Sequence, residues 1–456
     1  MRLDRSEELD NQAAAFLEAA CVPRESHSSG TLEQAEAVLA RDPQVGTSSI
    51  YAAAVLADEA AVRDFLAKDP ASATAKGGPR GWDALTHLCF SRYLRLDRTR
   101  SEGFVGTARA LLDAGASANT GWIEMIDHPN PRPVIEAAIY GAAGIAQHAG
   151  LTRLLLERGA DPNDEETAYH VAESRDNTVL KILLESGKLN EHSMSTLLLR
   201  KCDWHDEDGL RLILEHGANP NSMKHWGASA LHHAARRDNG LAMIELLLDY
   251  GGDPARMSRH GESAIRIFAW RGRADALELC EKRGFPVSLS GVDALVAACA
   301  RDQQEVIDLL NANEPQLTSR LLEHGGTLLS QFAGVGNVAG VRNLLDMGVP
   351  VDALYIEGDG YYGVAKNSTA LHAAAWRACP KVVEELIRRG APVDARDAQG
   401  RTAIQLAVKA CVDSYWMNHR SPDLVRALLA AGASTEGIGV PTGYEEVDEL
   451  LRRARR

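Results

Sequence analysis

The chain repeats a short pattern at intervals of about thirty-three residues, and this period limits its fold more than any other feature. The stretch ALHHAAR at 230–236 is matched by ALHAAAW at 370–376 and AIQLAVK at 403–409, each following a serine or threonine. The equivalent position recurs at residues 50, 85, 135, 169, 198, 231, 265, 295, 329, 371 and 404. One such repeat cannot bury its apolar face alone, so the sequence predicts about eleven stacked repeats.

A leucine-rich helical pattern that ends in glycine follows these openings. The clearest copies lie at 111–119, 154–163, 212–221, 246–255, 386–394 and 428–436. Glycine suits the left-handed residue that ends a helix, and Asp-Pro or Asn-Pro begins an extended turn. Each repeat is therefore predicted to contain a short helix, a tight turn, a longer helix and an extended finger. Leu246 and Leu247 are predicted to lie in the buried seam between longer helices.

Both signatures resemble those of the ankyrin repeat, which opens with T-P-L-H-x-A and closes with L-L-x-x-G-A-D-P/V-N. The resemblance covers residues 48 to 436. The family's proline is replaced by alanine at three openings, and its histidine is kept at His170, His232 and His372. The resemblance implies an all-α repeat solenoid of helix-turn-helix units with β-fingers. It also implies that His232 and His372 hydrogen-bond across the finger loops.

The charge and the cysteines narrow the classes of partner and compartment. A net charge of −14 and a pI near 5.6 argue against binding to nucleic acid or to anionic membranes. The seven cysteines are scattered without a CxxC pair, which predicts buried thiols in a reducing compartment. The sequence starts without a signal-type apolar segment and contains no membrane-length stretch. We therefore expect a cytoplasmic protein.

Two adjacent histidines, His232 and His233, are the first candidates for chemistry. A serine before the helix caps its free N–H groups, and an imidazole one turn later can reach neighbouring backbone. We predict this tie between repeats for His232, whereas His233 points to another side of the helix. Neither histidine is then a metal ligand or an acid–base group.

The stretch KCDWHDEDG at 201–209 concentrates metal-ligating residue types, so a metal site is one interpretation. The alternative is a solvated turn whose acids cap a helix that begins near Leu210, and we expect this turn. The sequence contains no G-x-S-x-G, P-loop or H-E-x-x-H motif. These observations predict no catalytic residues, no metal and no cofactor.

Two fingers exceed the period, at 116–133 and 349–367. In the second, ALYIE and YYGVA flank GDG, which predicts a long β-hairpin that projects beyond the other fingers.

These two fingers supply the candidate binding residues, which are Trp122, His128, Tyr355, Tyr361 and Tyr362. Tyrosine and tryptophan are favoured at binding hot spots, so we predict that the four aromatic residues are exposed. The alternative is that they pack on one another and only brace the fingers.

The remaining segments are predicted to be helical. Insertions at 91–104 and 411–423 are expected to add helical turns that shield the core. Residues 1–47 are predicted to form a helical N-terminal cap and 437–456 a C-terminal capping helix, with the solenoid from 48 to 436 between them.

Polar groups are distributed periodically rather than gathered in one pocket, which favours binding over catalysis. We predict a non-catalytic scaffold that binds a protein partner through its concave face and extended fingers. The alternative is an enzyme or small-molecule binder with its site between the long fingers and the concave groove.

Overall fold

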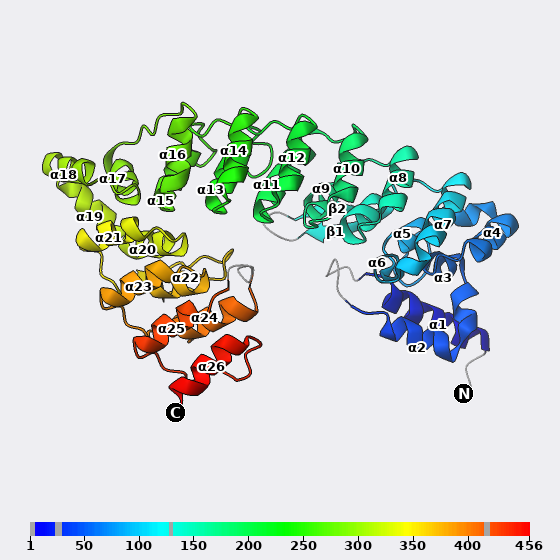
Figure 1. Cartoon of the computed structure of the whole chain (residues 1–456). Helices are drawn as coiled ribbons and strands as arrows, with labels where there is room; N and C mark the ends of the chain where they lie inside the picture. The colour runs from blue at the N-terminus through cyan, green and yellow to red at the C-terminus, as the bar shows by residue number, and fades with distance from the viewer. Residues whose placement is uncertain (1–4, 23–29, 127–130, 415–419) are drawn as a thin grey trace. The chain divides into compact units, whose positions relative to one another are not determined.

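The computed structural model describes residues 5–22, 30–126, 131–414 and 420–456. Contacts within the chain define two units, Met1–Ala230 and Leu231–Arg456, which we call the N-terminal and C-terminal units. Each is built from consecutive helix pairs joined by turns and fingers (Figure 1). The predicted all-α repeat architecture is therefore confirmed, with two short antiparallel sheets added to it.

The N-terminal unit contains one two-stranded sheet, β1 (Gly121–Ile126) with β2 (Arg132–Ala137). Its helices are α1 (Arg5–Ala20), α2 (Glu33–Arg41), α3 (Ile50–Val55), α4 (Glu59–Lys68), α5 (Ala84–Cys89), α6 (Arg92–Leu96), α7 (Ser101–Asp113), the π-helix η4 (Tyr140–Ile145), α8 (Ala149–Glu157), α9 (Glu166–Val171), α10 (Thr178–Glu185), α11 (Glu191–Asp203) and α12 (Glu207–Glu215).

The C-terminal unit contains the sheet of β3 (Leu354–Tyr355) and β4 (Ser368–Thr369). Its helices are α13 (Ala230–Arg236), α14 (Leu241–Asp249), α15 (Ala264–Trp270), α16 (Ala274–Lys282), α17 (Gly291–Ala300), α18 (Gln304–Asn313), α19 (Gln316–Glu323), α20 (Gly325–Gly334), α21 (Val338–Asp346), α22 (Ala370–Trp376), α23 (Pro380–Arg388), α24 (Ala403–Val412), α25 (Asp423–Ala430) and α26 (Glu445–Ala454).

In much of each unit, the first helices of successive pairs pack on one another, and so do the second helices. Thus α20 packs on α22 and α22 on α24, while α21 packs on α23 and α23 on α25. The alanines of the openings allow this close approach, and Ala370, Ala374 and Ala375 are fully buried. In α14, Leu246 and Leu247 are 4% and 0% exposed, so their predicted burial is confirmed.

The predicted repeat positions lie on first helices with one exception. Ile135 belongs to β2 and is 39% exposed, so this assignment is wrong. The first helical element of that repeat is η4, which begins at Tyr140 next to the buried Ile139. The sequence VIEAA at 134–138 resembles the opening of a first helix. Its residues 134–137 instead belong to β2 and pair with β1.

One finger is replaced by a helix that the sequence pattern did not predict. Between α18 and α20 the chain forms α19, which follows Pro315 at its N-terminus. The usual glycine stop is missing after α18, where the sequence continues NANEPQ. The glycine stops elsewhere behave as predicted, since Gly159 and Gly217 have φ angles of +92° and +86°.

The insertions and ends are largely helical. Residues 92–100 form α6 and a 3₁₀ turn, with Tyr93 fully buried, as predicted for 91–104. In the second insertion, residues 415–419 lie outside the described residues. Helices occupy both predicted caps, 1–47 and 437–456, and their capping role stays a prediction. No helix among the described residues has the length and apolarity needed to cross a bilayer.

The seam between second helices leads to a stability prediction for α14. Replacing Leu247 with alanine should lower the free energy of unfolding by about 2–5 kcal/mol, because it leaves a cavity in a closed core. Leu241→Ala on the same helix is the matched control, since Leu241 is 40% exposed. Urea unfolding of both variants measures the difference, and equal losses would show that the assigned helix face is wrong.

Candidate functional site

The histidines of the repeat openings connect neighbouring repeats. His232 is fully buried, and its Nε2 lies 2.9 Å from the carbonyl oxygen of Glu262. His372 Nε2 lies 3.0 Å from the Ala395 carbonyl oxygen and 3.1 Å from that of Arg401. Burial lowers the pKa of both imidazoles. The predicted structural tie is confirmed for both histidines.

The side chains of the stretch 201–209 also have structural roles. Asp206 caps α12 by accepting a hydrogen bond from the Gly209 N–H at 3.0 Å, as predicted. Its carboxylate also lies 2.6 Å from the Lys201 ammonium, which is fully buried and donates to the Ser174 carbonyl at 2.7 Å. The expectation of a solvated turn is therefore wrong for Lys201 and Asp206. Among the described residues, no three His, Cys, Asp or Glu side chains are grouped as metal ligands.

The second long finger, which we call the tyrosine loop (residues 354–369), differs from the predicted hairpin. Its strands are the short β3 and β4, and a single bridge joins Asp359 to Val364. Tyr355 and Tyr362 are only 7% and 6% exposed, whereas Tyr361 is 38% exposed. The prediction that the loop projects and exposes its tyrosines is therefore wrong for two of the three.

The tyrosine loop is held by a buried charge cluster. Asp238 accepts hydrogen bonds from Arg271 at 2.5 and 2.6 Å and from Arg377 at 2.6 Å. The Tyr362 ring lies 3.9 Å from the Arg377 guanidinium and 5.5 Å from that of Arg271. Burial opposes ionisation of Asp238, but the two guanidinium groups outweigh it and hold its pKa well below the usual range.

The three charged residues come from different repeats, because they follow α13, α15 and α22. Asp359 adds a contact between the loop and Arg271 at 3.5 Å. The loop therefore folds back against the ends of first helices. The alternative interpretation of these tyrosines, that they brace the fingers, fits Tyr355 and Tyr362.

This packing predicts that Tyr362→Ser lowers the free energy of unfolding by about 3 kcal/mol, as expected for loss of a buried aromatic ring. Tyr361→Ser is the matched control and should cost about 1 kcal/mol or less, since its ring is partly exposed. Denaturant unfolding distinguishes the two. A large loss of unfolding free energy for Tyr361→Ser and none for Tyr362→Ser would contradict the role of Tyr362 in bracing the loop.

In the first long finger, β1 and β2 form an antiparallel ribbon with two different faces. Ile123 pairs with Ile135 and Met125 with Pro133 on the outer face. Ile123, Met125 and Ile135 are 60%, 56% and 39% exposed. These residues make an apolar surface that the sequence interpretation did not identify.

The inner face of the ribbon packs against the first helices. Trp122 is 9% exposed and stacks on Trp82, with ring centroids 5.5 Å apart and an interplanar angle of 12°. Phe90 meets Trp122 edge to face at 5.8 Å. The predicted exposure of Trp122 is therefore wrong, and His128 lies outside the described residues.

A group of acids joins this inner face to α9. Glu136 is 2% exposed, and burial together with Glu166, Glu124 and Asp164 raises its pKa to about 8. Burial also raises the pKa of Asp164 to about 6. Burial opposes protonation of His170. Hydrogen bonds to Glu166 and Glu173 outweigh burial and raise the pKa of His170 to about 9.

These pKa shifts predict that the N-terminal unit loses stability as the pH rises. Between pH 4.5 and about 8, folded Glu136 holds a proton that the unfolded chain has released, so stability falls through that range. His170 acts in the same direction, because its contribution is lost as the pH rises through about 9.

Glu136→Gln should therefore reduce the loss of stability between pH 4.5 and about 8, by about 1 kcal/mol or more. Urea unfolding measures this, and Glu215→Gln on the exposed side of α12 is the control. An unchanged pH dependence in Glu136→Gln would show that the carboxyl group is ionised in the fold.

Next to the ribbon, the N-terminal unit carries a finger aromatic cluster made of Tyr169, His192, His225 and Trp226. The Trp226 ring lies 4.1 Å from His225 and 6.4 Å from Tyr169, and His192 lies 5.3 Å from His225. Trp226 is 46% exposed, and its φ of +53° is unusual for a non-glycine residue. The signal that could have found it is an aromatic residue before glycine in a finger, in KHWGA.

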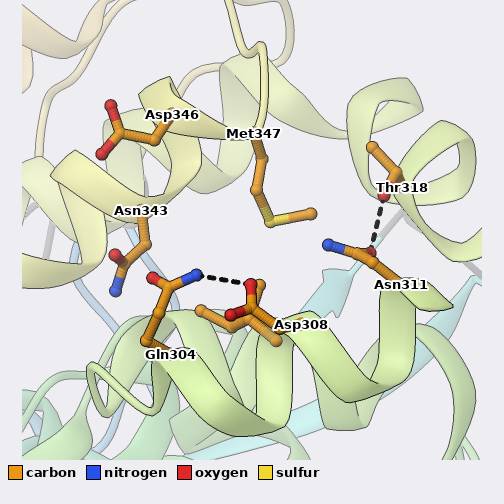
Figure 2. A pocket seen from close by; sticks show the side chains of 8 residues that line it. Gln304, Asp308, Asn311, Thr318, Asn343, Asp346 and Met347 are labelled. Atoms are coloured by element: carbon orange, nitrogen blue, oxygen red, sulfur yellow. Dashed lines mark hydrogen bonds between the residues drawn. The ribbon is translucent and has the colours of Figure 1, made fainter.

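A cavity of about 270 Å³ lies between α18, α19 and α21 in the C-terminal unit (Figure 2). Its polar lining includes Gln304, Asp308 and Asn311 of α18, and Ile307 and Met347 add apolar surface. The Gln304 amide donates to Asp308 at 2.8 Å, and the Thr318 hydroxyl donates to Asn311 at 2.8 Å.

Comparison with known families agrees with the repeated helix pairs. The family model "Ankyrin repeat" matches residues 366–398, and the model "Ankyrin repeats (many copies)" matches residues 198–248. The chain therefore contains ankyrin repeats, as predicted from the sequence.

Two curated relatives come from Arabidopsis thaliana. E3 ubiquitin-protein ligase KEG is 23% identical over 244 residues, which cover 49% of this chain and 14% of that protein. Serine/threonine-protein kinase 12 is 37% identical over 84 residues, or 18% of this chain and 16% of that protein. The chain thus spans less than a fifth of the length of either relative.

Two solved ankyrin repeat domains are also similar. That of human ASB11 is 24% identical, covers 59% of this chain and 98% of its own, and gives a TM-score of 0.26. That of Bcl-3 is 20% identical, covers 51% of this chain and 96% of its own, and gives a TM-score of 0.22.

Proposed function

We propose that this ankyrin repeat protein is a non-catalytic scaffold and that its main partner surface lies on the N-terminal unit. Ankyrin repeats are protein–protein interaction modules. The observation that carries the location is the outer face of the β1–β2 ribbon, where Ile123 and Met125 are more than half exposed. Clustered exposed apolar side chains mark interaction surfaces, and this ribbon keeps Trp122 and Glu136 inward.

The finger aromatic cluster extends the proposed surface. Trp226 has a large, partly exposed ring and few rotatable bonds. Such residues are enriched at the centres of interfaces. Glu165 lies between the ribbon and the finger aromatic cluster. It pairs with Arg132 of β2 at 2.6 Å and directly precedes α9, the helix that contains Tyr169. Of the residues chosen from sequence, Tyr361 and His128 stay proposed contacts. Trp122 supports the ribbon from beneath, whereas Tyr355 and Tyr362 brace the tyrosine loop of the C-terminal unit.

An enzyme or small-molecule binder is the weaker proposal. Two of the titratable groups with shifted pKa values near the ribbon, Asp164 and His170, are engaged by backbone or by other side chains. Asp164 caps α9 by accepting from the Thr167 N–H at 2.7 Å, and His170 lies 3.1 Å from Glu166. We also propose a cytoplasmic protein without nucleic-acid partners, from the net charge of −14 and the seven free cysteines.

The proposal predicts that Trp226→Ala and the double variant Ile123→Ser/Met125→Ser each weaken partner binding roughly tenfold or more, as for hot-spot residues. The full chain is used as bait to isolate the partner, and binding of each variant is then measured by calorimetry. Met257→Ser is the control, because Met257 is 56% exposed in the C-terminal unit. Normal binding by both variants, with loss in Met257→Ser, would place the partner elsewhere.

A further inference from the structure

The cavity between α18 and α21 interrupts the row of second helices. Further along the C-terminal unit such helices pack directly, as α21 does on α23 and α23 on α25. Here α19 takes the place of a finger and packs against α17 and α18. The space left between α18 and α21 is the cavity of about 270 Å³ (Figure 2).

The face of α18 that lines the cavity is polar where a seam would be apolar. Gln304, Ile307, Asp308 and Asn311 have the i, i+3, i+4, i+7 spacing of a single helix face. In α23, by contrast, the buried positions of the helix are Val382, Val383, Glu385 and Leu386, of which the three apolar ones are fully buried. The polar stripe of α18 is therefore an exception to the packing of this unit.

The lining of the cavity combines hydrogen-bond acceptors with an apolar floor formed by Ile307 and Met347. The Gln304 amide donates to Asp308 Oδ1, which leaves the second carboxylate oxygen of this exposed side chain available. Asp346 is already paired with Arg389 at 2.7 Å. Ile307 and the thioether of Met347, whose sulfur lies 3.3 Å from Cys299 Sγ, supply the floor.

The surroundings favour a positively charged ligand. Residues 302–323 contain five carboxylates, with Arg320 as the one basic residue of the segment. No lysine or arginine lines the cavity. A cation that enters therefore meets Asp308 without a competing charge from the lining.

We propose that this cavity binds an arginine side chain of a protein partner. The aliphatic stem packs on Ile307 and Met347, and the guanidinium group donates to Asp308. Arginine suits the site better than lysine, because its planar fork engages several acceptors and is more weakly hydrated. The proposal rests on the proposed function as a protein-binding scaffold, but it places a contact far along the chain from Trp226.

The test uses the full chain labelled with ¹³C at the methionine methyl groups and N-acetyl-arginine amide as the probe. The Met347 signal is identified by its absence from Met347→Leu. Millimolar probe should shift the Met347 signal saturably, and added salt should weaken the effect. N-acetyl-citrulline amide has nearly the same shape without the charge and should leave the signal in place.

Two variants complete the test. Asp308→Asn should weaken binding of the probe at least about threefold, as for loss of a solvent-accessible ion pair. Asp352→Asn, an exposed aspartate outside the lining, should bind normally. An unmoved Met347 signal, an equal response to the citrulline probe or normal binding by Asp308→Asn would each overturn the proposal. None of these outcomes depends on Trp226 or the ribbon, so the proposed function is judged separately.

Discussion

A pair of short helices has too little surface to bury its own apolar faces, and every other feature of this chain follows from that constraint. Each pair is stable because its neighbours cover it. The alanines of the first helices let neighbouring backbones approach closely, and the leucines of the second helices fill the seam behind them. Polar side chains such as His232 and His372 then connect the first helix of one repeat to the finger that leads into the next repeat.

Local signals in the sequence were sufficient for features that each repeat makes by itself. The glycine stops, the capping residue Asp206 and the buried Leu247 depend on residues a few positions away. These predictions needed only helical periodicity and the chemistry of helix ends. His232 differs, because its partner Glu262 lies 30 positions away, and the resemblance to the ankyrin repeat supplied its role.

The failures concern residues whose partners are distant in the chain. Asp238 meets Arg377 across 139 positions, so no local pattern showed that Tyr362 would be buried between arginines. Ile135 was assigned to a helix because its neighbours imitate an opening, whereas pairing with Ile123 determines its conformation. In the first long finger the aromatic residue chosen from sequence, Trp122, is therefore buried, and the exposed side chains are Ile123 and Met125.

The two long fingers differ in which side chains they bury and which they expose. The β1–β2 ribbon turns Trp122 and Glu136 inward and presents aliphatic side chains outward, which suits display. The tyrosine loop packs Tyr362 on Arg377, one of the two arginines whose guanidinium groups hold the buried carboxylate of Asp238. A buried charge cluster is costly to break, and it ties the loop to repeats that a simple finger would not reach.

Hydrogen–deuterium exchange across the free chain tests most directly whether polar ties make the tyrosine loop part of the rigid fold. The amides of Asp359, Val364 and Asn367 donate to carbonyl oxygens at 2.8, 2.9 and 2.9 Å. Peptides from this loop should therefore exchange about as slowly as those of α22, with the protection of cooperative structure. Exchange of the loop at the rate of an unstructured peptide, while α22 stays protected, would contradict this description.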